Sequence, residues 1–481
     1  MTHSASTLSV PFSGRILFLG FGSIASASIP LFLKHINCDI KQYHIISKDS
    51  VFWNIADLYG ISYDNTALTR DNYEQVLGDF GLTKGDFVVN LTVDVSSKDI
   101  ILYCNKVGAL YVDTVVEPWA GVYLDPNLTS SDKSNYALRE EVVCMKGQLE
   151  GGPTAVIAHG ANPGMVNHFV KRALLEIAAL TAPDKKEPTD REGWAKLAED
   201  LGLKVIQVSE RDTQQSYLQK KPNEFFNTWS VTGFIIEGIF QPAELGWGTH
   251  ETELPRLGKS HLFGCDAAIY IEQPGASLKV RGWTPNEGPY HGFLVTHNEA
   301  IGIADYFTGL DDCGFESYRP TVFYCYHPCD AAVLGVHEIL GRNSKEQDVK
   351  HIMMDDIVSG NDELGVLLLG DFNGDFSGYW HGSNLSIDQT RALIPHNNAT
   401  SLQVAIGVLS AFIWAVENPN RGLVEPEDMD HHRILEIADP YLGNVVSVKT
   451  DWNPTKESNA VIEEFVDKED VWSFNNFRVK F

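Results

Sequence analysis

The sequence predicts an α/β protein: a Rossmann-type, doubly wound parallel sheet with a second, inserted α+β domain. Three observations predict this fold class. Short apolar runs alternate with helical stretches from Arg15 to about Gly164, a pattern typical of parallel sheets covered by helices on both faces. Strand patterns then predominate from Lys204 to Leu369. A strongly apolar helical stretch, Thr400–Glu417, follows them and is expected to pack back onto the first domain.

The first domain is expected to span residues 1–165. It opens with the short apolar run Arg15–Gly20, a glycine turn, and the helical stretch Ser23–Ile36. The remaining strands are Tyr43–Ile46, Phe87–Leu91, Ala109–Val115 and Thr154–Ala158, and the remaining helices are Ser96–Lys106 and Asn135–Gly147. Short strands between amphipathic helices indicate successive βαβ units.

The second domain is expected at 166–397, with a return helix at about 398–420 and a C-terminal extension at 421–481. Helices are predicted at Val166–Leu180, Glu192–Leu201 and Cys329–Leu340. Strands are predicted at Lys204–Val208, Phe225–Trp229, Ile269–Glu272, Leu278–Gly282, Gly292–Thr296, Val322–Tyr326 and Gly365–Leu369. The acidic stretch Glu425–His432 is expected to be a solvated loop or tail element.

Composition narrows the class of protein. The 481 residues are 43% hydrophobic and 21% charged, which is ordinary globular composition. There are 37 Lys and Arg against 64 Asp and Glu, a net charge of −27. Such a surface repels phosphate backbones, so no nucleic-acid partner is expected, and it suits a cationic small ligand. Acidity that merely keeps the protein soluble is the plainer alternative.

The compartment is predicted from the start of the chain, its apolar runs and its cysteines. No run approaches the ~18 apolar residues of a membrane span, and the polar start, Met1 to Val10, lacks the pattern of a signal peptide. Seven cysteines, an odd number without a regular framework, indicate free thiols in a reducing compartment. We therefore expect a cytoplasmic protein that does not bind membranes.

The first strand is followed at once by a dinucleotide fingerprint. Gly20-Phe-Gly22-Ser23-Ile24-Ala25 matches G-x-G-x-x-G/A and opens a helix. Gly20 permits the tight turn, Gly22 lets the backbone approach a pyrophosphate, and Ala25 permits close packing of helix on strand. The N-terminus of the helix, at Ser23 and Ile24, supplies amide N–H groups for the phosphates. A structural turn is the alternative.

The ribose position leaves the choice between NAD and NADP open. An acidic residue at the end of the second strand marks NAD. This chain has Ser47, Lys48 and Asp49 there. Asp49 would suit NAD, whereas Ser47 with Lys48 would accept a 2′-phosphate.

Polar residues follow three of the predicted strands. They lie at Asn90 to Asp94, at Asp113 to Glu117 and at His159 to Asn162. Ligands of open parallel sheets bind at the carboxyl ends of the strands, so these residues are site candidates. Helix caps and turns are the alternative for any one of them. The nicotinamide is expected near six residues: Asn90, Thr92, Val93, Thr114, Ala161 and Asn162.

Twelve blocks of sequence, in order along nearly the whole chain, resemble the homospermidine synthase family. They are GFGSIA at 20–25, NLTVD at 90–94, DTVVEPW at 113–119, SNYALRE at 134–140, GANPGMV at 160–166, ERDTQ at 210–214, NTWSV at 227–231, QPAELGWGT at 241–249, LVTHNE at 294–299, YHPC at 326–329, DELGVLL at 362–368 and ENPN at 417–420. The resemblance implies a saccharopine-reductase-like fold whose inserted domain binds substrate and forms a homodimer. Ser47 departs from the aspartate expected of the family.

The resemblance also implies a reaction and its partners. The family uses bound NAD to make homospermidine from two putrescines, or from spermidine and putrescine. One amine is oxidised to an imine, ammonia leaves, a second putrescine forms a Schiff base, and the bound NADH reduces it. A saccharopine-reductase-like imine dehydrogenase and a non-catalytic polyamine or dinucleotide sensor are the alternatives.

Roles follow for residues inside the matching blocks. Putrescine is a dication, and binding it requires carboxylates at both ends with apolar or aromatic walls between. The expected substrate-binding residues are Asp94, Glu117 and Asp362. The expected catalytic residues are Glu210, Glu237, His297, Asn162 and Trp229, with Glu237 and His297 as base and acid and the Trp229 indole facing a cation. Taken alone, Trp229 also fits a buried core aromatic, and His297 a hydrogen-bonded histidine at a strand end.

No metal centre is predicted. Cys325-Tyr-His-Pro-Cys329 lacks a second ligand pair, and the EF-hand-like run from Asp371 has no glycine or glutamate at the required positions. His431 and His432 are expected at the surface.

Overall fold

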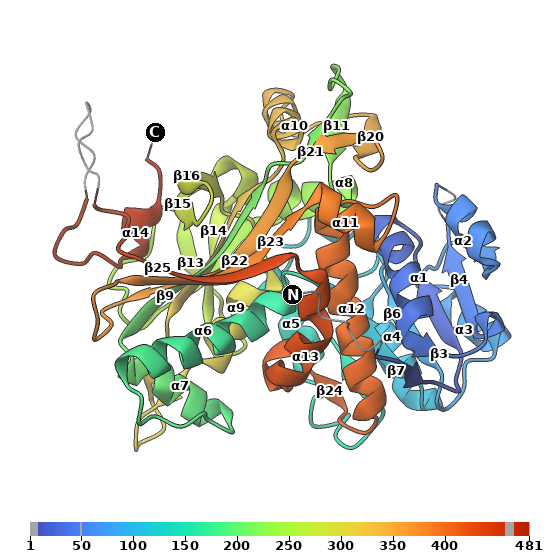
Figure 1. Ribbon diagram of the computed structural model, residues 1–481, viewed down its shortest axis with the longest axis horizontal. Helices are drawn as coiled ribbons and strands as arrows, with labels where there is room; N and C mark the ends of the chain where they lie inside the picture. Colours follow the sequence, from blue (N-terminus) through green and yellow to red (C-terminus); the bar gives the residue numbers. More distant parts are fainter. Residues whose placement is uncertain (1–7, 49–50, 457–465, 481) are drawn as a thin grey trace.

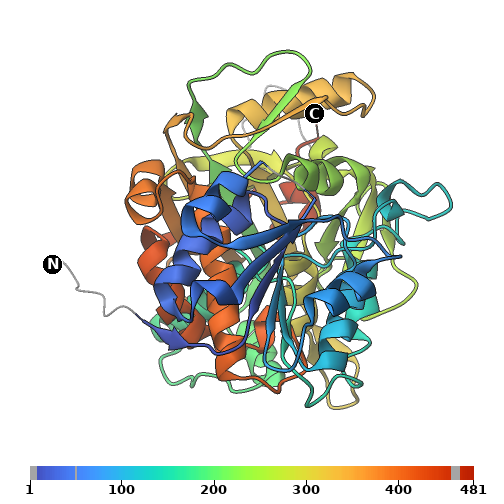
Figure 2. The ribbon, with the colours of Figure 1, turned by 90° about the vertical axis from the view of Figure 1, so that its right-hand side faces the viewer.

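The computed structural model describes residues 8–48, 51–456 and 466–480. Two sheets lie side by side with helix α12 (Ala399–Glu417) between them, and Figure 2 shows helices on both faces of the first sheet (Figures 1 and 2). The predicted α/β class with a Rossmann-type sheet is confirmed.

The first sheet has seven parallel strands in the order β24-β8-β7-β6-β2-β4-β5. They are β2 (Ile16–Leu19), β4 (Tyr43–Ser47), β5 (Ser62–Asn65), β6 (Phe87–Asn90), β7 (Leu110–Asp113), β8 (Ala155–Val156) and β24 (Leu423–Val424). Its helices are α1 (Ser23–His35), α2 (Trp53–Tyr59), α3 (Tyr73–Phe80), α4 (Ser97–Val107) and α5 (Asn135–Val143). The order reverses at β2, so the carboxyl ends of β2 and β6 border the crevice in which such sheets bind ligands.

The second sheet is mixed. Its ten strands are β9 (Leu203–Asp212), β12 (Pro242–Gly246), β13 (Gly258–Ser260), β14 (Ala268–Pro274), β15 (Lys279–Thr284), β16 (Gly288–Phe293), β19 (Thr321–His327), β22 (Asn361–Gly370), β23 (Gly378–Ser386) and β25 (Asn444–Thr450). Strand β9 lies near the centre, parallel to β19 and antiparallel to β22. Acidic residues at one end of β9 and at the start of β22 are thereby brought together.

The remaining helices belong to the second half of the chain, and four small strand pairs, of which β1–β3 lies in the first domain, complete the fold. The helices are α6 (Met165–Thr181), α7 (Arg191–Asp200), α8 (Val231–Ile235), α9 (Asn298–Tyr306), α10 (Asp330–Gly341), α11 (Ile387–Leu393), α13 (His431–Ala438) and α14 (Phe474–Phe477). The pairs are β1 (Val10–Pro11) with β3 (Ile36–Asn37), β10 (Gln215–Ser216) with β21 (Ile357–Ser359), β11 (Glu224–Asn227) with β20 (Val349–Ile352), and β17 (Gly309–Leu310) with β18 (Glu316–Tyr318). Helix α6 packs on β22 and β23.

Helix α12 joins the two halves of the molecule. It packs against α1 and β7 of the first half and against α13. Among the described residues it is the one helix long and apolar enough to cross a membrane, with a mean hydropathy of 1.8. Since 89% of that stretch is buried inside the protein, its apolar composition is explained by its place in the core.

Several predicted strands end elsewhere than expected. Gly292–Thr296 was expected as one strand, but β16 ends at Phe293, and the chain then turns into α9. The predicted strand Phe225–Trp229 ends at Asn227, which releases Trp229 from strand geometry. Six strands of the two sheets were not predicted: β5, β12, β13, β23, β24 and β25. All four β5 side chains are exposed, so β5 lacks the apolar alternation by which strands are recognised.

The described residues of the segment 421–481 do not form a separate extension. Its strand β24 pairs with β8 in the first sheet, and β25 pairs with β23 in the second. The prediction that Glu425–His432 is a solvated loop is also wrong. Glu425 forms an ion pair with the buried guanidinium of Arg139, with Nε 2.7 Å from Oε1, and Glu427 is buried. The pairing with Arg139 offsets the cost of burying the Glu425 carboxylate, so this segment packs inside the protein.

His431 does not lie at the surface as predicted, although His432 does. Only 4% of His431 is exposed, and burial, with His432 and Lys171 nearby, lowers its pKa to about 4. The ring packs edge-on against Trp194.

Candidate active site

The turn between β2 and α1 has the shape that a pyrophosphate requires. Gly20 has φ +82°, and a Cβ there would lie 2.9 Å from the carbonyl oxygen of Leu91. A Cβ on Gly22, by contrast, would meet no atom of the described residues within 4 Å. No side chain caps the helix that begins at Ser23, so the amides of Ser23 and Ile24, which have no acceptor within the helix, are oriented toward that open space. The residues present fit a dinucleotide.

Ser47 lies at the end of β4 and contacts the same turn. Its hydroxyl accepts a hydrogen bond from the Phe21 amide at 3.2 Å. The residue that most often binds the ribose is therefore replaced by a short hydroxyl side chain. The other candidate, Asp49, lies outside the described residues.

The candidates for the nicotinamide region lie at the carboxyl ends of β6, β7 and β8. Asn90 is buried, donates to the Tyr111 hydroxyl at 3.0 Å and accepts from the Thr92 hydroxyl at 2.5 Å. Val93 is half-buried beyond it. Thr114 follows β7, and a Cβ on Gly160 would lie 3.4 Å from its methyl group. Ala161 is buried next to Gly160. Asn90 thus orients Thr92 at the edge of the sheet.

Two carboxylates follow β6 and β7. Asp94 has φ +68°, and its carbonyl accepts from the Ala120 amide. Glu117 is buried and accepts a hydrogen bond from the Tyr123 hydroxyl at 2.9 Å. Burial, with the negative charges of Glu237 and Asp94, raises the pKa of Glu117 to about 8. A cation placed beside these groups would favour the ionised form of Glu117.

His297 lies between two carboxylates. Its Nε2 is 3.1 Å from Oε2 of Glu237, and its Nδ1 is 3.2 Å from Oε1 of Glu299. Burial opposes a charge on the ring, but the two carboxylates outweigh it and hold the pKa of His297 well above its usual value. Glu237 lies in a π-helical turn, Ile236–Phe240. The two carboxylates therefore favour the protonated imidazolium form of His297, which could donate a proton from either ring nitrogen.

A second group of acids lies at the junction of β9 and β22. Asp362 stands opposite Asp212 in the strand register. Glu210 accepts hydrogen bonds from the Tyr324 hydroxyl at 2.5 Å and from the Asn162 amide at 3.2 Å. Burial raises the pKa of Glu210 to about 7 and of Asp212 to about 6. It raises that of Asp362 further, in the company of Glu210 and Asp212. A bound cation would stabilise the negative charge of this group.

Trp229 borders this second group. Its indole N–H donates to the Tyr326 hydroxyl at 3.0 Å, and the Tyr326 ring stacks on Tyr324 with centroids 5.2 Å apart. The indole is half-buried against Phe234, so it is not the fully buried core aromatic of the alternative interpretation. A π-face and buried carboxylates occur together at this point.

The two acid groups form one series. His297 packs on Tyr324 with ring centroids 4.5 Å apart, and Tyr324 donates to Glu210. His297 also pairs with Glu237, whose charge acts on Glu117. The series therefore runs from the edge of the first sheet into the second sheet, and it contains all eight of the predicted catalytic and substrate-binding residues or touches them.

Relatives of known identity extend over the same length of chain. The chain is 48% identical over 470 residues to a homospermidine synthase of Blastochloris viridis, covering 97% of this chain and 98% of the relative. It is 45% identical over 474 residues to one of Mesorhizobium japonicum, covering 97% of each. The chain belongs to the homospermidine synthase family.

Structural and domain comparisons agree with this assignment. The crystal structure of the homospermidine synthase of Legionella pneumophila in complex with NAD is 42% identical, with a TM-score of 0.91, and the alignment covers 99% of this chain and 100% of that one. Residues 16–156 match the saccharopine dehydrogenase NADP binding domain, and residues 160–450 match the saccharopine dehydrogenase C-terminal domain. The predicted family is confirmed.

Sequence reasoning missed several members of this candidate site. They are Tyr123, Asp212, Glu299, Tyr324 and Tyr326. Asp212 and Glu299 each lie two residues from a predicted site residue, inside the blocks ERDTQ and LVTHNE. Tyr324 and Tyr326 are two positions apart on β19, so their side chains point to the same face of the sheet. Proximity to Glu210 and His297 in the sequence was the available signal for the acids, but nothing local distinguished the tyrosines from core aromatics.

Proposed function

We propose that this chain makes homospermidine by NAD-dependent transfer of a 4-aminobutyl group from putrescine, or from spermidine, to putrescine. The observation that carries the proposal is the continuous series of carboxylates, with Trp229 and His297 among them, that begins at the dinucleotide edge of the first sheet. Membership of the homospermidine synthase family supports it, as does the NAD complex of the Legionella pneumophila relative. The enzyme is expected to work in the cytoplasm.

The first sheet supplies the residues that would hold NAD. They are Gly20, Gly22, Ser23, Ile24 and Ser47 on the phosphate and ribose side, and Asn90, Thr92, Val93, Thr114, Ala161 and Asn162 toward the nicotinamide. When bound there, NAD would supply the chemistry of taking a hydride from the carbon beside an amine and returning it to an imine.

The deep acids would prepare the amine for this chemistry. The carbon beside a protonated amine does not give up a hydride readily, so the ammonium proton must first move to a base. Glu210, with a pKa of about 7, is suited to accept that proton near neutral pH, and Asn162 would orient the amine beside it. Asp362 would pair with the ammonium group at the other end of the diamine, which keeps its proton.

The outer residues would hold the second amine and move protons between the half-reactions. Asp94 and Glu117 lie at the edge of the first sheet, where an incoming diamine would meet carboxylates. His297 would protonate the departing amine, and Glu237 would accept a proton from the attacking one. The Trp229 face would stabilise the cationic imine between them.

An imine dehydrogenase acting on amino acids is the weaker alternative. Its substrate carboxylates would need Arg or Lys partners. The side chains that form the series are acids, aromatics and a histidine, which favour cationic amines. Within this family, the sensor alternative also leaves the acid and base pairs without a role.

The cofactor is expected to be needed only catalytically. Two putrescines give homospermidine and ammonia with no net redox change, so one retained NAD suffices for many turnovers. The measurement is amine chromatography at NAD far below putrescine, with the absorbance of reduced cofactor followed in parallel. Product should exceed NAD many-fold. Free NADH that accumulates in step with product would identify an ordinary dehydrogenase instead.

Replacing Trp229 by Ala is expected to cost much more activity than replacing it by Phe. Both variants lose the hydrogen bond to Tyr326, but the Phe variant keeps an aromatic face. A cation–π contact of about 0.5–2 kcal/mol corresponds to a roughly 2- to 30-fold difference in kcat/KM for putrescine. Wild-type turnover in both variants would remove Trp229 from the mechanism.

A homodimer is part of the proposal. The segment 254–263 of the second domain presents apolar side chains to solvent: Leu254, Leu257, Leu262 and Phe263, with Leu262 97% exposed. Such a group of residues is typical of a protein interface. Light scattering should give twice the chain mass of 53.4 kDa. The mass of one chain would contradict the dimer.

A further inference from the structure

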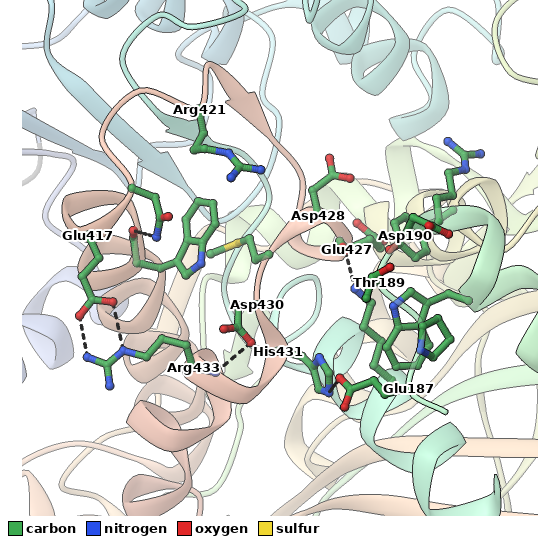
Figure 3. A pocket seen from close by; sticks show the side chains of 18 residues that line it. Glu187, Thr189, Asp190, Glu417, Arg421, Glu427, Asp428, Asp430, His431 and Arg433 are labelled. Atoms are coloured by element: carbon green, nitrogen blue, oxygen red, sulfur yellow. Dashed lines mark hydrogen bonds and ion pairs between the residues drawn. The ribbon is translucent and has the colours of Figure 1, made fainter. Parts of the chain in front are cut away.

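A pocket far along the chain from the proposed active site contains a group of potential metal ligands. The pocket has a volume of about 650 Å³, and it lies at the end of α12 that carries Glu417, whereas Thr400 at the other end touches Asp362. Its side chains come from α6, α7 and the segment between them, from α9, from the end of α12 and the residues that follow it, and from the start of α13 (Figure 3).

Three side chains at its edge offer ligand atoms within 4.8 Å of one another: Glu187, His431 and His432. Nε2 of His432 is 2.9 Å from Oε1 of Glu187, and Nε2 of His431 is 3.7 Å from the same oxygen. Figure 3 shows the Glu187 carboxylate and the His431 ring pointing toward one another. We propose that Glu187, His431 and His432 form a binding site for a divalent transition-metal ion such as Zn²⁺.

His431 provides an independent reason to expect a ligand. It is 4% exposed, and its buried Nε2 has no hydrogen-bond partner among the residues that the structure describes. A buried polar atom is normally satisfied, and 3.7 Å to the carboxylate is too long for a hydrogen bond. A metal ion between the three groups would give this nitrogen a partner.

The chemistry and the surroundings fit a transition metal. Two imidazoles and one carboxylate form a borderline donor set that suits Zn²⁺ and similar ions better than Ca²⁺ or Mg²⁺. The His431 ring is held by Trp194, whose plane lies at 88° to it with centroids 5.6 Å apart. Carboxylates outnumber basic side chains in the pocket lining, where they are Glu187, Asp190, Glu417, Glu427, Asp428 and Asp430. A cation is therefore favoured there.

The site would connect two segments that are remote in the sequence. Glu187 lies in an irregular stretch between α6 and α7, whereas the two histidines begin α13. A bound ion would attach the first segment to the second. Since it binds only the folded chain, it should raise the unfolding temperature.

The test uses full-length enzyme freed of metal by a chelator. Zinc chloride is titrated by calorimetry into the wild type and into His431→Gln, His432→Gln and Glu187→Gln. Each variant is expected to lose one zinc equivalent or to weaken its Kd at least tenfold, because loss even of a group that only supports a ligand costs about 10- to 100-fold. Zinc should raise the thermal midpoint of the wild type and leave that of His432→Gln unchanged.

His396→Gln is the matched control, because His396 forms an exposed pair with Asp355, away from this pocket. It should bind zinc like the wild type. Zinc bound at the carboxylates near His297 would persist in all four variants and so does not confuse the result. His432 and Glu187 are exposed, so their variants remain informative if the His431 variant fails to fold. Wild-type stoichiometry and affinity in both of them, or no zinc bound by the wild type, would overturn the site.

Discussion

Glu237→Gln is expected to lower kcat by roughly 10²- to 10⁴-fold, the usual contribution of a positioned acid or base. The substitution is nearly isosteric, so it removes charge and proton transfer without opening a cavity. Oε2 of Glu237 lies 3.1 Å from Nε2 of His297, and its loss removes one of two carboxylates that keep the ring protonated. The measurement is steady-state homospermidine formation with saturating putrescine.

The pH profile separates this role from a merely structural one. The His297 pKa is held well above its usual value by Glu299 and Glu237. If His297 acts as the acid, activity falls as pH rises through that pKa. In Glu237→Gln the fall should begin at lower pH, because one supporting charge is gone. Glu272→Gln, which removes a carboxylate from an exposed pair with Lys259, is the control. A folded Glu237 variant with the wild-type rate and profile would exclude this assignment.

Glu210→Gln is expected to lower kcat/KM for putrescine by roughly 10- to 150-fold. The estimate is the loss of one hydrogen bond to a charged partner, about 1.5–3 kcal/mol. Burial raises the pKa of Glu210 to about 7, so below that pH the carboxyl is neutral and attracts the diamine less. Wild-type kcat/KM should therefore rise with pH through about 7. The variant should show a shallower rise, since Asp212 and Asp362 still titrate.

Glu251→Gln is the matched control for Glu210. Glu251 is also a buried carboxyl whose pKa burial raises to about 7, but it accepts hydrogen bonds from Thr321 and from the Phe474 amide, at another part of the second sheet. It should keep wild-type kcat/KM. Equal losses in the two variants would mean that removing any buried carboxyl impairs the enzyme, and Glu210 would have no special role.

Local sequence determined the first half of the fold and the cofactor turn. Apolar runs separated by helical stretches, and glycine at 20 and 22, are recognisable without tertiary information, because each depends on backbone sterics and on hydrophobic periodicity within a few residues. The twelve sequence blocks were also sufficient to predict the family. Strand ends were harder to predict, as Phe293 and Asn227 show, because the partner strand decides where pairing stops.

The tertiary structure alone decided which acids share a site and in what charge state. Asp212 and Asp362 are 150 positions apart and become neighbours only through the register of β9 and β22. The charge on His297 depends on Glu237, which an irregular helical turn brings to it. The environment of Glu425–His432 also depends on a remote residue, although the sequence of this segment suggests a solvated loop. Arg139, remote along the chain, neutralises Glu425 and so allows the segment to pack inside. Electrostatic environment is a property of three-dimensional neighbours, and the sequence does not state them.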